Sequence, residues 1–230
     1  MLLLALSVLP GLYFWWPSRQ DPTCRSNLGS ALLTGAMVAF GVLFLQLLFE
    51  DRFTTLEETR SRERERDQAR QQLILQIGLQ KDLSNIDLAG RKDLVGLYLS
   101  GKILSGANLS DTDLRGAQFV QTTLDGSAQL VGADLRGADL RRANLEGSFL
   151  NRAKLQRALL NQACLQGADL SGAELNGADF SAADLRGTIF DGAEMIAGAA
   201  LGGAAYDEQT RWPEGFTPTG PPSDSAICER

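Results

Sequence analysis

The chain has 230 residues, which is enough for one domain of ordinary size with additional segments, and its formal net charge is −6. It contains no histidine, which excludes Ser-His-Asp and Cys-His catalysis and every histidine-ligated metal site. Its three cysteines, Cys24, Cys164 and Cys228, form no CxxC pair and match no zinc or iron–sulfur spacing. We therefore expect three unrelated thiols, without a metal centre or a disulfide framework.

Residues 1–49 have the composition of a membrane anchor. The stretch 28–49 carries no formal charge, and at about 1.5 Å per residue a helix of this length reaches roughly 33 Å, enough to cross a hydrocarbon core of about 30 Å. Residues 1–16 are also uncharged but shorter, and a cleaved signal peptide fits them poorly because no basic residue precedes the apolar run. We predict a transmembrane helical hairpin of residues 1–16 and 28–49. Whether 1–16 spans the bilayer, lies at its interface or is removed stays open.

Arginines on either side of residues 28–49 predict the orientation of this anchor. The turn before the segment holds two arginines, and the twenty-one residues after it hold six: Arg52, Arg60, Arg62, Arg64, Arg66 and Arg70. The positive-inside rule then places the long C-terminal part of the chain in the cytoplasm.

Residues 50–83 form a connector whose first two thirds are rich in charged helix formers and lack glycine and proline. We predict a solvated helical stalk. A dimeric coiled coil is the less favoured alternative, because its 4-3 seam is charged at Arg60, Glu63, Asp67 and Arg70. The apolar end of the connector, LILQIGLQKDL, is predicted to cover the open end of the repeat array that follows.

From Ala128 onward, fourteen successive units of five residues keep one phase, with Leu, Phe or Met at every third position from Leu130 to Met195. A second run in a shifted phase has its centres between Leu94 and Leu124. A period of five fits neither an α-helix nor a flat strand, so the backbone must turn by the same amount every five residues. Four turns of about 90° close a square coil, which stacks Leu130 beneath Leu150. The central side chain and the preceding alanine fill the interior, and glycine at the fifth position allows the corner.

The units ADLRGADLRRANLEG and ADLSGAELNGADF resemble the A(D/N)LXX motif of the pentapeptide-repeat family. The resemblance implies an all-β repeat solenoid over residues 84–203, a right-handed quadrilateral β-helix with a solid core, and it implies no activity. The layout of apolar hairpin, charged helix and repeats resembles a membrane-anchored bacterial type, which implies a location at the bacterial plasma membrane. A subset of the family resembles duplex DNA in shape and charge and binds DNA gyrase.

The pattern fails after residue 203. Residues 204–216 contain Tyr206, Trp212 and Phe216 and are predicted to cap the C-terminal end of the β-helix. Residues 217–230 are rich in Pro, Gly and Ser, and we predict a disordered tail.

The phase also assigns the outward residues. Asp134, Lys154, Glu174 and Glu194 share one column, and Cys164 is predicted to carry an exposed thiol. Basic side chains gather in the middle of the array and acidic ones towards its C-terminal end, and three apolar residues occupy an otherwise polar outward position. The candidate partner-binding residues are Arg136, Arg141, Arg142, Arg152, Lys154, Arg157, Phe149, Leu159 and Ile189.

These features predict a non-enzymatic, membrane-tethered scaffold for protein–protein interaction, with the lipid bilayer and a cytoplasmic protein as partners. The alternative is a DNA-mimicking modulator of DNA gyrase or another nucleic-acid enzyme, which is less favoured because basic residues interrupt the acidic surface. No phosphate loop or paired acids indicate an enzyme. We expect no cofactor, no metal and no direct binding of nucleic acid.

Overall fold

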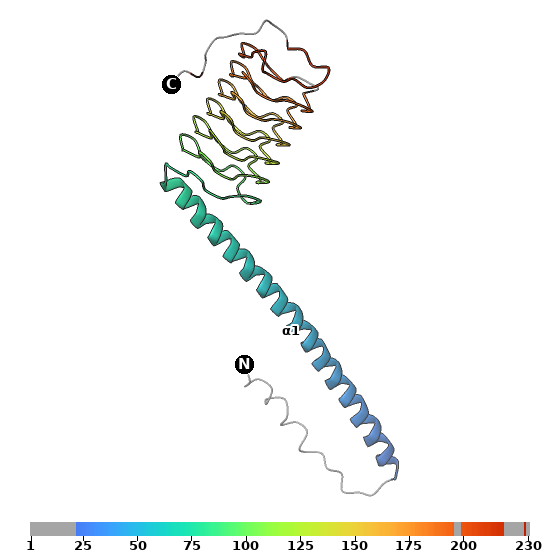
Figure 1. Cartoon of the computed structure of the whole chain (residues 1–230). Helices are drawn as coiled ribbons and strands as arrows, with labels where there is room; N and C mark the ends of the chain where they lie inside the picture. Colours follow the sequence, from blue (N-terminus) through green and yellow to red (C-terminus); the bar gives the residue numbers. More distant parts are fainter. Residues whose placement is uncertain (1–21, 196–198, 219–227, 229–230) are drawn as a thin grey trace. The chain divides into compact units, whose positions relative to one another are not determined.

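The computed structural model describes residues 22–195, 199–218 and 228 of the chain (Figure 1). One helix, α1 (Pro22–Leu79), precedes a series of coils that are held together by single parallel β-bridges. The chain divides into two compact units, Met1–Glu65 and Arg66–Arg230.

The first unit contains the N-terminal part of α1, and it differs from the predicted hairpin. The helix begins at Pro22, a residue suited to the first helical position because its fixed φ matches the helix and its missing N–H has no helical partner there. The chain is therefore helical from within the predicted turn into the predicted stalk. Over the part of the chain that the structure describes, no helix is both long and apolar enough to cross a membrane. The transmembrane hairpin is thus not supported, and its arm 1–16 lies outside the described residues.

Between residues 35 and 47 the side chains of α1 are apolar, with one glutamine, and nearly all are exposed. Met37 and Phe40 are each 74% exposed, and Leu43 is 58% exposed. Successive side chains project about 100° apart around a helix, so these residues present apolar surface on every side of α1.

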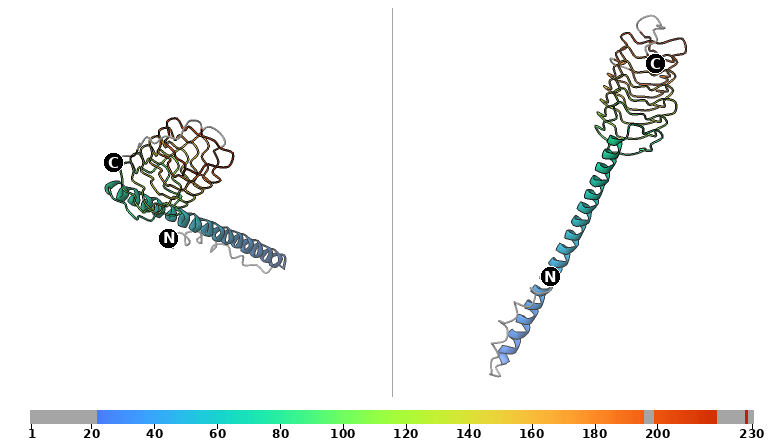
Figure 2. Two further views of the ribbon diagram at one scale, coloured as in Figure 1. Left: turned by 45° about the horizontal axis from the view of Figure 1, so that its top comes forward. Right: turned by 90° about the vertical axis from the view of Figure 1, so that its left-hand side faces the viewer.

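The second unit is a right-handed quadrilateral β-helix, and the views in Figures 1 and 2 show its coils stacked on one another. Residues 20 to 22 positions apart form parallel bridges, as in the ladder Asp134↔Lys154↔Glu174↔Glu194. Each side ends in a turn in which the first N–H of the next unit donates to the carbonyl of the central residue, as Ala133 does to Leu130 at 3.0 Å. The third residue of this turn has positive φ, +66° at Gly132, which is the signature of a type II turn and favours glycine.

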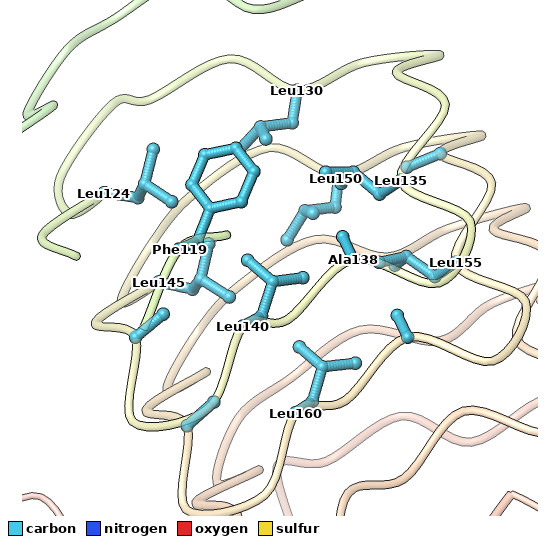
Figure 3. Packing of buried hydrophobic residues seen from close by; sticks show 14 of the residues in the cluster. Phe119, Leu124, Leu130, Leu135, Ala138, Leu140, Leu145, Leu150, Leu155 and Leu160 are labelled. Atoms are coloured by element: carbon cyan, nitrogen blue, oxygen red, sulfur yellow. The ribbon is translucent and has the colours of Figure 1, made fainter. Parts of the chain in front are cut away.

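The interior of the coils is filled by the repeated central residues. Leu130, Leu150 and Phe190 have no exposed surface, and the alanine two residues before most central positions is equally buried. Figure 3 shows such side chains converging between the walls of the coils. The prediction that a period of five stacks its leucines inside a four-sided coil is confirmed.

Small hydroxyl residues replace alanine at several interior positions, and the structure shows why they are tolerated. The Thr112 and Thr188 hydroxyls each donate to a backbone carbonyl of the preceding coil, at 2.9 and 2.8 Å. The Ser148 hydroxyl donates to the carbonyl of Leu145 at 2.7 Å. Because every hydroxyl has an acceptor, its burial leaves no unsatisfied polar group.

The N-terminal end of the β-helix is covered by the last turns of α1. Ile77 is 1% exposed, and Leu73 and Ile74 pack against the core from the same side of the helix. The ammonium group of the buried Lys102 donates to the carbonyl of Gln80 at 2.6 Å and to that of Gly78. These hydrogen bonds satisfy carbonyls that the end of a helix leaves without a partner. The first ladder pair is Asp82↔Ile103, so the coils begin slightly before residue 84.

Aromatic residues close the C-terminal end. The Trp212 ring stacks on Phe190 with centroids 5.1 Å apart, and the Tyr206 ring meets Trp212 edge-on at 5.5 Å. Phe216 lies against Trp212 at 5.3 Å. The last ladder pair, Ile189↔Arg211, joins this segment to the coils.

Candidate docking surface

In each five-residue unit, the outward residue just before the central leucine belongs to one of four ladders. The two residues after the central leucine form a corner. Arg136, Arg141, Arg142, Arg152 and Arg157 all occupy corners, whereas Lys154 lies on a ladder. The six basic residues therefore fall into two groups. One side of the coils and the two corners that bound it hold Arg136, Arg152, Lys154 and Arg157. A different corner, the second one along the chain after that of Arg152, holds the positions of Arg141 and Arg142.

Arg136 and Arg141 are neutralised within their own units. The Arg136 Nε and Nη2 groups donate to the two oxygens of Asp134 at 2.7 and 2.6 Å, and Arg141 holds Asp139 in the same two-point geometry at 2.8 and 2.7 Å. The hydrogen bond from the arginine is the main cause that lowers the pKa of each aspartate. Sequence reasoning missed these pairs, although the signal is visible: in ADLRG, Asp and Arg flank one inward leucine and so project outward together.

Arg142, Arg152 and Arg157 differ from these two. Their φ values are +58°, +57° and +60°, at the corner position where most units have glycine. A left-handed conformation costs a non-glycine residue about 1–2 kcal/mol. None of the three takes part in an ion pair of the described chain.

The side chains of these three arginines extend over the coil that follows their own in the sequence. The Arg142 Nε group donates to Gln162 Oε1 at 2.8 Å. The Arg152 stem passes Gly172, where an added Cβ would lie 3.5 Å from the Arg152 Cγ atom, and Arg157 passes Gly177 at 3.6 Å in the same way. The aliphatic stems of Arg152 and Arg157 thus lie against glycines of the next coil, while their guanidinium groups stay at the surface.

Two consecutive coils carry opposite charges. Residues 148–167 contain three basic residues and no acid, whereas residues 168–187 contain four acids and one arginine. The side of the first coil that runs from Arg152 through Lys154 to Arg157 is called the basic side here. Lys154 lies on its ladder between Asp134 and Glu174, but Asp134 is bound by Arg136 and Glu174 accepts a hydrogen bond from Gln156. Both acidic ladder neighbours of Lys154 are therefore bound by other residues.

The acids of the second coil are bound by amides of the first. At each of the four corners, an Asn or Gln side chain donates to the carboxylate 18 positions later. Asn151 reaches Asp169 at 2.5 Å, Asn161 reaches Asp179 at 2.5 Å, and Gln166 reaches Asp184 at 2.7 Å. Together with the Gln156–Glu174 contact, these four hydrogen bonds form the amide ring: Asn151, Gln156, Asn161 and Gln166.

Asp184 is the most enclosed of these acids, because its side chain has no exposed surface. Burial by itself raises its pKa, but hydrogen bonds from Arg186 and Gln166 outweigh burial, so that the pKa is lowered and the carboxylate stays charged. The amide ring therefore links two consecutive coils at every corner by hydrogen bonds to carboxylates.

A shallow groove of about 530 Å³ lies at the corner of Arg141 and Arg142. Val120, Asn161 and Gln162 form the rest of its lining. Since Arg141 is held by Asp139 and Arg142 by Gln162, this groove presents hydrogen-bonding groups that are already partly occupied.

The three outward apolar residues do not form one spot. Phe149 and Ile189 share a ladder but have Asp169 between them, whereas Leu159 lies on the ladder between Asp139 and Asp179. Four sides per coil place residues ten positions apart on opposite sides, which separates Phe149 from Leu159. Leu159 therefore does not share a side of the coils with Phe149 and Ile189.

Cys164 is not a free thiol. It is bonded to Cys228, with the two Cα atoms 5.8 Å apart, and this corrects the expectation of three unrelated cysteines. The prediction failed because the cysteines are 64 positions apart, and only the path of the chain brings them together. Within the described residues, no group of His, Cys, Asp and Glu side chains could hold a metal ion.

Comparison with known proteins agrees with this geometry. A family model for pentapeptide repeats (8 copies) matches residues 93–127, 127–162 and 163–196. No curated protein matches the sequence.

Among solved structures, the chain is similar to a pentapeptide-repeat protein, Rfr23, from the cyanobacterium Cyanothece 51142. The two are 25% identical, with 60% of this chain and 95% of that chain covered and a TM-score of 0.37. A pentapeptide-repeat protein from the thylakoid lumen of Arabidopsis thaliana is 31% identical over 46% of this chain and 65% of its own, with a TM-score of 0.24. Full-length QnrB1, a plasmid-mediated fluoroquinolone resistance protein, is 20% identical over 55% of this chain and 94% of its own, with a TM-score of 0.20. On the family match and the four-sided coils, the repeat domain of this chain belongs to the pentapeptide-repeat family.

Proposed function

We propose that this chain is a non-enzymatic scaffold, tethered to a lipid bilayer by the apolar part of α1, whose repeat domain docks an acidic protein through the basic side. The proposed attachment to a bilayer is supported by the exposure of apolar side chains on every side of α1 between residues 35 and 47. A helix that is apolar all round is stable only where apolar material covers it. The acyl chains of a bilayer cover all sides at once, whereas a single protein groove covers one.

The basic side supports a docking role. Arg152, Lys154 and Arg157 follow one another along one side of a coil that contains no acid, and no ion pair of the described chain involves them. Arginine at a strained corner has a conformational cost that glycine avoids. Two such arginines flanking one lysine form a positive surface that complements a carboxylate-rich partner.

The interior supports a binding role rather than catalysis. Fully buried side chains, mostly Leu, Ala and Phe, fill it, so substrates have no access to the centre of the described coils. Arginines bind Asp134, Asp139 and Asp184, and the amide ring also binds Asp184, so that the pKa values of these three carboxylates are lowered. These are features of a rigid surface rather than of groups that exchange protons.

The DNA-mimic alternative is less supported by the surface charges. A mimic of duplex DNA needs a regular array of one sign, whereas Arg115, Arg136 and Arg141 neutralise their aspartates and the basic side interrupts the array. A gyrase supercoiling assay separates the two functions, and strong inhibition by the full chain would favour the mimic.

The tether is tested by flotation of the full chain with liposomes. We expect the chain to float, and the double variant F40R/L43R to remain at the bottom of the gradient. The matched control L75R/L79R places the same charges at exposed leucines nearer the end of α1 and should still float. Equal flotation of all three proteins, or of none, would contradict the tether.

Docking is tested with a fluorescent poly-glutamate peptide as the probe. We expect salt-sensitive binding that the variant R152Q/R157Q weakens by about 5- to 30-fold. The matched control R136Q/R141Q also removes two charges, but from arginines that already hold aspartates, so its effect should be smaller. Equal losses in both variants would indicate that net charge, and not the basic side, attracts the probe.

A further inference from the structure

The bond between Cys164 and Cys228 joins parts of the repeat domain that the sequence separates by 64 positions. The Cα–Cα distance of 5.8 Å lies within the range that disulfides span. Cys164 stands on a ladder between Asn144 and Asp184, and its side chain is half-buried. The bond closes a loop that includes the last coils and the aromatic residues that cap them.

The surroundings of Cys164 indicate a structural bond rather than a reactive thiol pair. Reactive thiolates are stabilised by a histidine, a metal, a neighbouring cation or a helix N-terminus. The chain has no histidine, and the ladder neighbours of Cys164 are an amide and the charged carboxylate of Asp184.

The bond has a structural task at the end of the chain. The last ladder pair is Ile189↔Arg211, and the last backbone hydrogen bond joins Phe216 to Pro213. Among the described residues beyond Phe216, the disulfide is the one bond to the coils. The disulfide can hold the chain end against the coils only as long as it is not reduced to two thiols.

We propose that the repeat domain folds and works in an oxidising compartment outside the cytosol. Cytosolic thiols are kept reduced, whereas structural disulfides form and persist outside the cytosol.

This inference reverses the orientation that the arginines around residues 28–49 predict. The positive-inside rule applies to short connections, and long domains cross largely regardless of their charge. The 181 residues after Phe49 are a long domain rather than a short connection. The disulfide is therefore the stronger indicator of the compartment. The inference is independent of whether the basic side docks a partner.

Thiol trapping of the full chain tests the inference directly. Bacterial cells with an oxidising periplasm that express the chain are quenched in acid, and the protein is alkylated with a polyethylene-glycol maleimide before and after reduction. We expect one adduct before reduction, at Cys24, and three adducts after it. Three adducts in the unreduced sample of growing cells, or a disulfide that appears only after an added oxidant, would overturn the proposal.

A second experiment tests the side of the membrane. In the variant C24S/C164S, Cys228 is the one remaining thiol, and a membrane-impermeant maleimide is added to spheroplasts. We expect Cys228 to be labelled without lysis, while the matched variant C164S/C228S, which retains only Cys24, controls for non-specific entry. Labelling of Cys228 that requires lysis places the domain in the cytosol and overturns the proposal. Retained protease resistance of the coils in both variants excludes misfolding as the cause of either result.

Discussion

The apolar residues of α1 between positions 35 and 47 and the leucines of the coils have similar chemistry but opposite exposure. Met37 and Phe40 are each 74% exposed, whereas Leu130 and Leu150 have no exposed surface. The difference lies in periodicity: a period of five on a turning path brings each leucine to one interior, whereas consecutive apolar residues on a helix radiate in all directions. Apolar composition alone therefore does not say what will cover a side chain.

The largest expected effect is the loss of folding stability when a leucine of the coils is truncated, compared with a leucine of the apolar part of α1. Leu150→Ala removes a fully buried side chain from a solid interior and should lower the free energy of unfolding by about 3–5 kcal/mol. Leu43→Ala in the exposed apolar part of α1 should leave the unfolding of the coils unchanged. Guanidinium denaturation followed by circular dichroism measures both, and equal shifts of the midpoint would break the comparison.

Removal of the disulfide should have the next largest effect, and again only in the coils. Cross-linking over 64 positions restricts the unfolded chain, and its loss should lower the free energy of unfolding by about 2–4 kcal/mol. The measurement is thermal unfolding of C164S/C228S beside the unaltered chain with and without a reductant. An unaltered chain whose melting temperature does not change on reduction would contradict the bond.

The amide ring gives a smaller effect that depends on burial. Gln166→Ala deprives the fully enclosed Asp184 of one donor, and it should lower the free energy of unfolding by about 1–3 kcal/mol. Asn161→Ala affects Asp179, whose residue keeps partial exposure, so water replaces the lost donor and the effect should be smaller. The order of the two denaturation midpoints checks the claim, and the reverse order would contradict it.

Acid should produce the smallest and most gradual change. The pKa values of Asp113, Asp134 and Asp139 are lowered mainly by hydrogen bonds from Arg115, Arg136 and Arg141. A lowered native pKa means that the stabilisation is complete above the unfolded value of about 3.9 and is lost as the pH falls through the native value. The melting temperature of the coils should thus hold from pH 7 to about 5 and fall below about 4. In the variant D134N/R136Q the fall should be shallower.

The sequence predicted some levels of this structure better than others. The five-residue phase was sufficient for the coils, their leucine ladders and the outward positions of Arg152, Lys154 and Arg157, because periodicity is a local property. It also implied that residues twenty apart are neighbours, so the Asn151–Asp169 and Gln166–Asp184 contacts could have been found from the corner positions. The Asp134–Arg136 pair could also have been found, because the two residues flank one inward leucine.

Other features depend on information that a single sequence lacks. The partner of Cys164 is set by where the chain goes after the last coil, and no spacing rule encodes that path. The beginning of α1 at Pro22 was hidden because the polar residues 22–27 look like a turn, although Pro is also favoured at the first helical position. Phe149 and Leu159 were grouped by their type, whereas the four-sided coil separates them by half a circuit.

The central claim, that each five-residue unit is one side of a four-sided coil, is tested most directly by cross-linking of engineered cysteine pairs. In a chain with C24S, the pair Q129C/F149C joins two residues that bridge on one ladder, where neighbouring strands lie about 4.8 Å apart. The pair Q129C/D139C joins residues on opposite sides. The account predicts rapid disulfide formation in the first pair and none in the second; cross-linking at residues ten apart, or its absence at residues twenty apart, would contradict it.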